Sequence, residues 1–105
     1  MPIDIDLKKI DGLIHSPTRL AVMAMLASGA EVDFTFLRDE LELTDGNLAT
    51  HVRKLEEARY VKCHKSFLDR RPRTSYTITA KGRAAFKRHV AELERIVNAT
   101  HKLKT

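Results

Sequence analysis

Apolar side chains recur with helical spacing along the first third of the chain. The first such group predicts a short helix and consists of Leu7, Ile10, Leu13 and Ile14. Ser16 and Pro17 have the residue types of an N-cap followed by a proline at the first helical position. The run from Thr18 to Ser28 is apolar on almost every side, which predicts a buried central helix that ends at Gly29.

Two more helices are expected next, joined by a short turn. Asp33 can cap the first of them, and Thr44 can cap the second, with Asp45 favourably placed in its first turn. Their inward faces are expected to carry Phe34, Leu37 and Leu41 in the first helix and Leu48, Val52 and Leu55 in the second. The second helix, at about residues 44–58, presents small and polar side chains on its other side, namely Gly46, Asn47, Thr50, His51 and Lys54.

Beyond residue 59 the apolar period changes from helical to alternating. The inward face of a first strand is expected to carry Val61, Cys63 and Phe67. The run of residues 74–79 is rich in β-branched side chains and predicts a second strand. The charged segment between them, residues 68–73, is expected to form the tip of a hairpin that spans about residues 60–79.

A long last helix follows, for which Thr79 is a suitable cap, and we expect it to span about residues 80–102. Its apolar stripe consists of Phe86, Val90, Leu93 and Val97, with Ile96 beside it. Two short helices followed by a basic hairpin make a winged helix-turn-helix. The predicted fold is therefore mainly α with a small β-hairpin wing (α+β), in one domain over residues 1–105.

Length and composition limit the class of protein. A chain of 105 residues is long enough for one domain. No apolar run approaches the roughly 20 residues needed to cross a bilayer, and the acidic N-terminus lacks the pattern of a signal peptide. The one cysteine, Cys63, cannot form an internal disulfide, which fits a reducing compartment. We therefore expect a cytoplasmic protein without membrane contact.

The net charge of +5 is unevenly distributed along the chain. Residues 1–50 contain 4 Lys and Arg against 9 Asp and Glu, whereas residues 51–75 contain 8 against 3 and residues 76–105 contain 7 against 2. A polarised basic half points to a polyanionic partner, and double-stranded DNA is the first candidate.

The polar side of the second helix of the pair suits the major groove of DNA. Asn47 can pair with adenine, Lys54 with guanine or phosphate, and Thr50 with phosphate or a thymine methyl group. We expect this helix to bind DNA through Thr44, Asn47, Thr50, His51 and Lys54, although His51 has the alternative of a plain surface histidine. The wing is expected to reach phosphates or a narrow minor groove with Lys65, Arg70, Arg71 and Arg73.

The chain resembles the MarR-like and ArsR-like winged-helix regulators, in their minimal form, over about residues 10–97. The segments that carry the resemblance are HSPTRLAVMAML, LRDELELTDGNLATHVRKLEEARYV, KSFLDRRPRTSYTIT and AKGRAAF. The resemblance implies a transcriptional regulator that binds a pseudo-palindromic operator as a homodimer, with residues 44–58 as the recognition helix and residues 65–74 in the wing. It also implies that an arginine next to Asp69 enters the minor groove. We expect a repressor, with an activator as the alternative.

Effector, metal and catalytic sites are not indicated. MarR relatives frame their ligand pocket with longer helices than this chain contains, so a small-molecule effector stays unknown. The ArsR metal sensors carry cysteines on the helix before the recognition helix, and the matching segment FTFLRDELEL has none. The scattered His residues lack the spacing of metal ligands, and Cys63 is interpreted as a small core residue rather than a redox sensor. Catalytic and phosphate-loop motifs are missing, so neither an enzyme nor a cofactor is expected.

The last helix is expected to mediate dimerisation. At about 23 residues it would be about 35 Å long, which is longer than so small a domain can cover. Its apolar stripe then needs a partner, most simply a second copy, with packing inside one subunit as the alternative. The second candidate function is a winged-helix protein–protein interaction module of the transcription machinery. Such a module would show apolar residues on the outer side of the second helix, where this chain shows polar ones.

Overall fold

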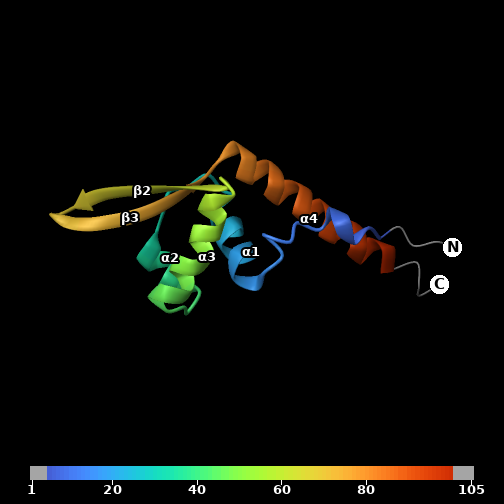
Figure 1. The fold of residues 1–105 in the computed structure, drawn as a ribbon, viewed down its shortest axis with the longest axis horizontal. Coiled ribbons are helices and arrows are strands. Elements are labelled where there is room, and N and C mark those ends of the chain that lie inside the picture. The colour runs from blue at the N-terminus through green and yellow to red at the C-terminus, as the bar shows by residue number, and fades with distance from the viewer. Residues whose placement is uncertain (1–4, 101–105) are drawn as a thin grey trace.

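The computed structural model describes residues 5–100, which fold into four α-helices and a three-stranded antiparallel sheet (Figure 1). The elements are a 3-10 turn at Leu7–Lys9, α1 at Pro17–Leu26, β1 at Val32–Asp33, α2 at Phe34–Glu40, α3 at Asp45–Glu57, β2 at Val61–Leu68, β3 at Arg71–Ile78 and α4 at Ala80–Thr100. The β2–β3 hairpin projects from one side of the helices, and α4 runs toward the opposite side (Figure 1). This arrangement is the winged helix-turn-helix that the order of elements predicts.

The N-terminal segment departs from the prediction, because the expected helix over Leu7–Ile14 is only a 3-10 turn of three residues. Asp11 explains the difference. Its side-chain Oδ1 accepts hydrogen bonds from the backbone N–H groups of Leu13 (3.0 Å) and Ile14 (3.2 Å), which competes with helix formation. The turn still delivers Ile14 into the core, where its side chain is fully buried.

The central helix α1 and the helix pair follow the sequence pattern closely. Ser16 is the N-cap residue and Pro17 the first residue of α1, and Gly29 takes the left-handed conformation (φ 92°) three residues beyond the helix. The side-chain oxygen of Thr44 caps α3 by accepting the N–H of Asn47 at 3.1 Å. Asp33 occupies the N-cap position of α2, but its side chain makes no cap hydrogen bond. The apolar faces of these helices form the core, together with residues of the sheet and of α4.

The hairpin has the expected extent, but its strands are longer and its tip is tighter than expected. Strands β2 and β3 continue to Leu68 and from Arg71, so the predicted six-residue tip is a two-residue turn made by Asp69 and Arg70. Both residues have positive φ (51° and 66°), as a tight hairpin turn of this hand requires. Because the outer half of the hairpin extends beyond the core, Phe67 is 77% exposed, and its expected inward position is wrong.

The short strand β1 was not predicted. It pairs with β3 through Val32 opposite Tyr76 and Asp33 opposite Ser75, which gives the order β1-β3-β2. A two-residue strand has no periodicity to detect, so only its partner strand defines it. Its pairing ties the wing to the start of α2.

Helix α4 buries a different stripe from the apolar one. Thr79 caps the helix as expected, with its Oγ1 accepting the N–H of Gly82 at 2.9 Å. The buried positions are Gly82, Ala85, His89 and Glu92. The predicted stripe lies at the edge of this buried face: Phe86, Val90, Leu93 and Ile96 are partly buried, and Val97 is 59% exposed. The last two residues expected in this helix, 101 and 102, lie outside the described residues.

Gly82 of α4 packs directly against the backbone at the start of the wing. A Cβ atom at this position would lie 2.1 Å from the backbone oxygen of Tyr60, whereas a Cβ at Gly46, in α3, would meet no atom within 4 Å. Gly82→Ala is therefore expected to destabilise the protein by about 1–3 kcal/mol, because backbone must move. Gly46→Ala should stabilise it by about 1 kcal/mol through helix propensity. Urea unfolding measures the change in the free energy of unfolding for each variant. Changes of the same sign in the two variants would contradict the prediction.

Candidate nucleic-acid interface

The outer face of α3 is polar and open to solvent. Its exposed residues include Gly46, Asn47, Thr50 and Lys54, and its opposite face buries Leu48, Val52 and Leu55. The hydroxyl of Thr50 donates to the carbonyl of Gly46 at 2.9 Å, which leaves its oxygen lone pairs as acceptors. The hydroxyl of Thr44, also exposed, is engaged by the cap of the helix. The structure therefore brings four of the five predicted helix residues to one open surface.

The fifth predicted helix residue, His51, is partly buried against α1. Its Nδ1 lies 3.0 Å from Nη1 of Arg19. Burial lowers the pKa of the His51 imidazole, and the positive charges of Arg19 and Lys54 lower it further. His51 is thus a neutral ring at pH 7 with one nitrogen bound inside the protein.

The wing residues fall into two groups. Lys65, Arg70 and Arg71 are exposed. Arg73, by contrast, binds inside the protein: its Nη2 lies 2.7 Å from Oδ1 of Asp33, and its Nη1 lies 3.3 Å from Oε2 of Glu31. The hydrogen bond that Arg73 donates to Asp33 raises the pKa of the Arg73 guanidinium, and the charge of Asp33 adds to the effect. The ion pairs of Arg73 therefore connect the wing to β1 and to the residue that precedes it.

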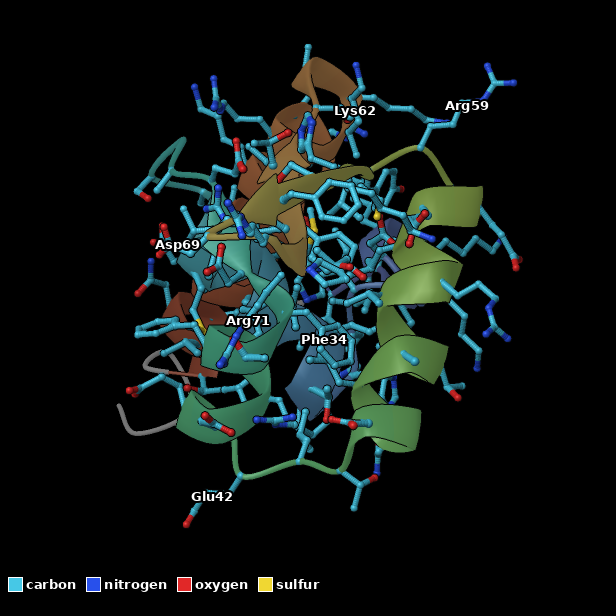
Figure 2. The ribbon with its side chains drawn as sticks, turned by 90° about the vertical axis from the view of Figure 1, so that its left-hand side faces the viewer. Phe34, Glu42, Arg59, Lys62, Asp69 and Arg71 are labelled. Carbon is cyan, nitrogen blue, oxygen red and sulfur yellow. The ribbon has the colours of Figure 1, made fainter. Side chains whose placement is uncertain are left out.

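An open groove of about 890 Å³ lies between α3, the start of α2 and the wing. Figure 2 looks along the wing and labels three of its lining residues, Phe34 of α2 and Asp69 and Arg71 of the wing. The charged side chains along it are Arg53, Glu56, Lys65, Asp69, Arg71, Arg73 and Asp33. Because Arg73 is paired with Asp33, the remaining cations outnumber the remaining carboxylates, and the groove can hold an extended anion.

The structure adds two residues that the sequence reasoning missed. Arg53 is exposed, lines the groove and follows Thr50 by three residues, so helical spacing alone could have identified it. Arg19 lies in α1, far from α3 in the sequence, and only the fold brings it to His51. No local signal marks that contact.

An ion-pair cluster secures the start of α3. Arg38 of α2 lies 2.9 Å from Oδ1 of Asp39 and 2.9 Å from Oδ1 of Asp45, the first residue of α3. The hydrogen bonds that Arg38 donates to both carboxylates raise the pKa of its guanidinium. The turn between the two helices passes through Glu42, which has a φ of 54° and lies at the opposite end of α3 from Arg59 (Figure 2).

The inner face of α4 contains a histidine without hydrogen bonds. The side chain of His89 is fully buried, and neither of its ring nitrogens has a hydrogen-bond partner among residues 5–100. Its ring meets that of His15 edge-on, with centroids 5.4 Å apart. Burial lowers the pKa of His89, and the neighbouring His15 contributes to the same effect. A cavity of about 490 Å³ between α4 and residues 8–11 adjoins this ring.

No group of three or more His, Cys, Asp or Glu side chains in residues 5–100 is arranged to hold a metal ion. Within the same range, no helix is both long and apolar enough to cross a membrane.

Residues 18–97 match the family of winged helix DNA-binding domains, and the chain belongs to this family. It is thus a DNA-binding protein of the winged-helix class, a family defined by binding rather than catalysis. An uncharacterized protein from Methanocaldococcus jannaschii is 40% identical over 81 residues, which are 77% of this chain and 88% of that protein.

Solved structures agree with this assignment. The transcriptional regulator homologue protein from Pyrococcus horikoshii OT3 is 35% identical, with a TM-score of 0.77 over 82% of this chain and 85% of that one. The transcriptional regulator BldR from Sulfolobus solfataricus is 23% identical, with a TM-score of 0.68 over 79% of this chain and 58% of that one, and it shares the fold.

The buried His89 makes the stability of the fold dependent on pH. Because its pKa in the folded state is below the unfolded value of about 6.5, the unfolded chain binds more protons as the pH falls through that value. The stabilisation is present above pH 6.5 and is lost as the pH decreases. His89→Gln cannot be protonated and should lose less stability than the wild type between pH 7 and pH 5. Urea unfolding measures the free energy of unfolding of both proteins across this pH range. An equal decrease in the two proteins would contradict the prediction.

Proposed function

We propose that the protein is a sequence-specific transcriptional regulator, acting as a repressor, that binds a pseudo-palindromic DNA operator as a homodimer. The observation that carries the proposal is the exposed polar face of α3, which lies beside a groove whose wing side carries free cations. In this proposal α3 enters the major groove, and the wing follows the adjacent backbone into the minor groove. The site of action is the cytoplasm.

Helix α3 supplies the base contacts in this proposal. Asn47 has the paired donor and acceptor that match adenine, and Lys54 donates to guanine or phosphate. Thr50 offers a methyl group and an acceptor oxygen. Arg53 faces the groove and is better placed for a phosphate between α3 and the wing than for a base.

The wing supplies positive charge. Lys65 and Arg71 line the groove, and Arg70 occupies the turn at its end. These three side chains are exposed and have no ion-pair partner among the described residues, so they can neutralise phosphates. Arg73 contributes differently, because its pairs with Glu31 and Asp33 hold the wing at a fixed angle to α2.

The homodimer is supported by the surface of α4. The helix has 21 residues and is about 32 Å long, and its outer half leaves apolar side chains without cover in the monomer. Val97 is 59% exposed, and Leu7, from the segment beside it, is 75% exposed. A second copy related by two-fold symmetry would bury both surfaces and place two α3 helices on one DNA duplex.

A protein–protein interaction module remains the second candidate, and apolar side chains on the wing favour it. Phe67 is 77% exposed and Leu68 58% exposed, at the end of the hairpin farthest from the core. The polar outer face of α3 favours DNA. The two functions differ in whether duplex DNA binds with a salt dependence.

The DNA proposal predicts different effects for the two faces of the wing. Lys65 lines the groove, whereas Lys62 is exposed on the other face of β2. Lys65→Ala should weaken binding to a selected site and to random DNA alike. It should also reduce the slope of the logarithm of affinity against the logarithm of salt concentration by about one unit. Lys62→Ala, which removes the same charge, should change the slope little.

Asn47→Ala, in α3, should weaken the free energy of binding by about 1–3 kcal/mol on the selected site only. Fluorescence titrations between about 50 and 200 mM salt test all three, and binding insensitive to salt would favour the protein-docking candidate.

The dimer proposal predicts that charge on the apolar stripe separates the subunits. The double variant Leu93→Glu/Val97→Glu introduces two carboxylates into the expected seam and should sediment as a folded monomer. The matched control, Ala84→Glu/Ala91→Glu, alters two exposed positions on the far side of α4 and should remain dimeric. Equal behaviour of the two variants in analytical ultracentrifugation would place the seam elsewhere.

A further inference from the structure

Arg19 joins three segments that are distant in sequence. It extends from α1, and its Nε donates a hydrogen bond to the backbone carbonyl of Leu13. Its Nη1 lies 3.0 Å from Nδ1 of His51 in α3. The guanidinium is planar, so the contact with Leu13 also fixes the direction in which the N–H group meets the imidazole.

The chemistry of the contact determines the state of the imidazole. A guanidinium has only donors and keeps its charge in proteins, so Nδ1 of His51 must be the acceptor. The ring is then neutral, and its single proton is on Nε2. A protonated ring would place N–H against N–H and two positive charges at contact distance, which the geometry does not allow.

The free nitrogen of His51 faces the proposed DNA surface. Nε2 of His51 has no hydrogen-bond partner in residues 5–100. The buried side-chain N and O atoms without a partner in that range are the two ring nitrogens of His89, so Nε2 of His51 is open to solvent. His51 follows Asn47 by four residues and precedes Lys54 by three, so all three share one side of α3. Nε2 can therefore reach a group that lies against that side.

We propose that Arg19 is a positioning residue that makes His51 a hydrogen-bond donor, and only a donor, toward DNA. The inference rests on the proposed DNA-binding function and names one of its specificity determinants. A donor at Nε2 can bond to guanine through O6 or N7, to thymine through O4 or to adenine through N7, and it leaves the N4 amino group of cytosine unpaired. The base that faces His51 is thus expected to be guanine, thymine or adenine rather than cytosine.

The surroundings of His51 support the same state. Burial, Arg19 and Lys54 lower the pKa of the imidazole, so the ring stays neutral through the physiological range. Because Lys54 and Arg19 are both cations, each of them disfavours a positive charge on the His51 ring. The donor role of Nε2 therefore does not change with pH near 7.

The first test is independent of DNA. Nitrogen-15 NMR of the imidazoles in the free protein should show His51 with its proton on Nε2 and a pKa below 6.5. Arg19→Lys keeps the charge, but its ammonium group ends one atom short of the position of Nη1, so it should release Nδ1 of His51 and give a mixture of both tautomers. A wild-type proton on Nδ1, or a tautomer ratio unchanged in Arg19→Lys, would overturn the inference whatever the DNA results.

The second test measures recognition of each base at the position that depends on His51. That position is the one whose preference disappears in His51→Asn, which keeps an acceptor for Arg19 but has no group at the place of Nε2. This variant should lose about fivefold in affinity for the selected site and nothing for random DNA. His51→Gln can present either end of its amide, so it should retain the selected site within about twofold and also accept cytosine.

Arg19→Lys decides between a positioning role and a purely structural one. It should bind random DNA as the wild type does, because the charge is kept, and it should lose about half or more of the discrimination against cytosine at the His51 position. Unchanged discrimination in a folded Arg19→Lys protein would overturn the inference while leaving the DNA-binding proposal intact. The absence of any preferred site in the wild type would overturn that proposal itself, and the reading role with it.

Discussion

The relative positions of the helix pair, the wing and α4 depend on the backbone around Tyr60. The N–H of Tyr60 donates to the carbonyl of Leu55 at 2.9 Å, and its carbonyl accepts both the N–H (3.0 Å) and the hydroxyl (3.1 Å) of Thr79. Its own hydroxyl donates to Asp11 at 2.8 Å, and Gly82 lies against its carbonyl with no room for a Cβ. The end of α3, both ends of the hairpin and the start of α4 are thus held together. Under the proposed function, this contact sets the distance between two α3 helices in a dimer.

The opposite charges of the two parts of the chain are partly paired within the fold. Carboxylates of the acidic first half are used as structural partners: Glu31 and Asp33 bind Arg73, and Asp11 binds Tyr60. Folding thus brings Glu31 and Asp33 to the wing, where they neutralise Arg73. The positive charge of the wing then lies on Lys65, Arg70 and Arg71, which have no ion-pair partner among the described residues.

The sequence predicts what local chemistry determines, and fails where a distant partner decides. Thr44 and Thr79 cap helices that begin within three residues of them, so spacing and residue type were sufficient. Asp33 has the residue type of a cap, yet its carboxylate binds Arg73, forty residues away, in preference to the end of α2. His51 was assigned to the correct helix, but its contact with Arg19 could not be anticipated. The apolar stripe of α4 was found, whereas its buried face around Gly82 depends on the shape of its neighbour.

Within residues 5–100, four charged residues take the left-handed conformation that favours glycine: Glu42, Arg59, Asp69 and Arg70. An L-residue in this conformation costs about 1–2 kcal/mol, and all four side chains are exposed and add nothing to the core. The end of α3 offsets this cost at Arg59, where the N–H donates to Glu56 at 2.9 Å. The end of α2 does the same at Glu42, whose N–H donates to the carbonyl of Asp39 at 3.2 Å, followed by the N–H of Leu43, which donates to that of Arg38 at 2.9 Å. At the wing tip, a glycine in place of Arg70 would relax the turn but remove a charge from the point proposed to enter the minor groove. Stability and DNA affinity therefore make opposing demands on this residue, which is expected where a binding element projects beyond the core that supports it.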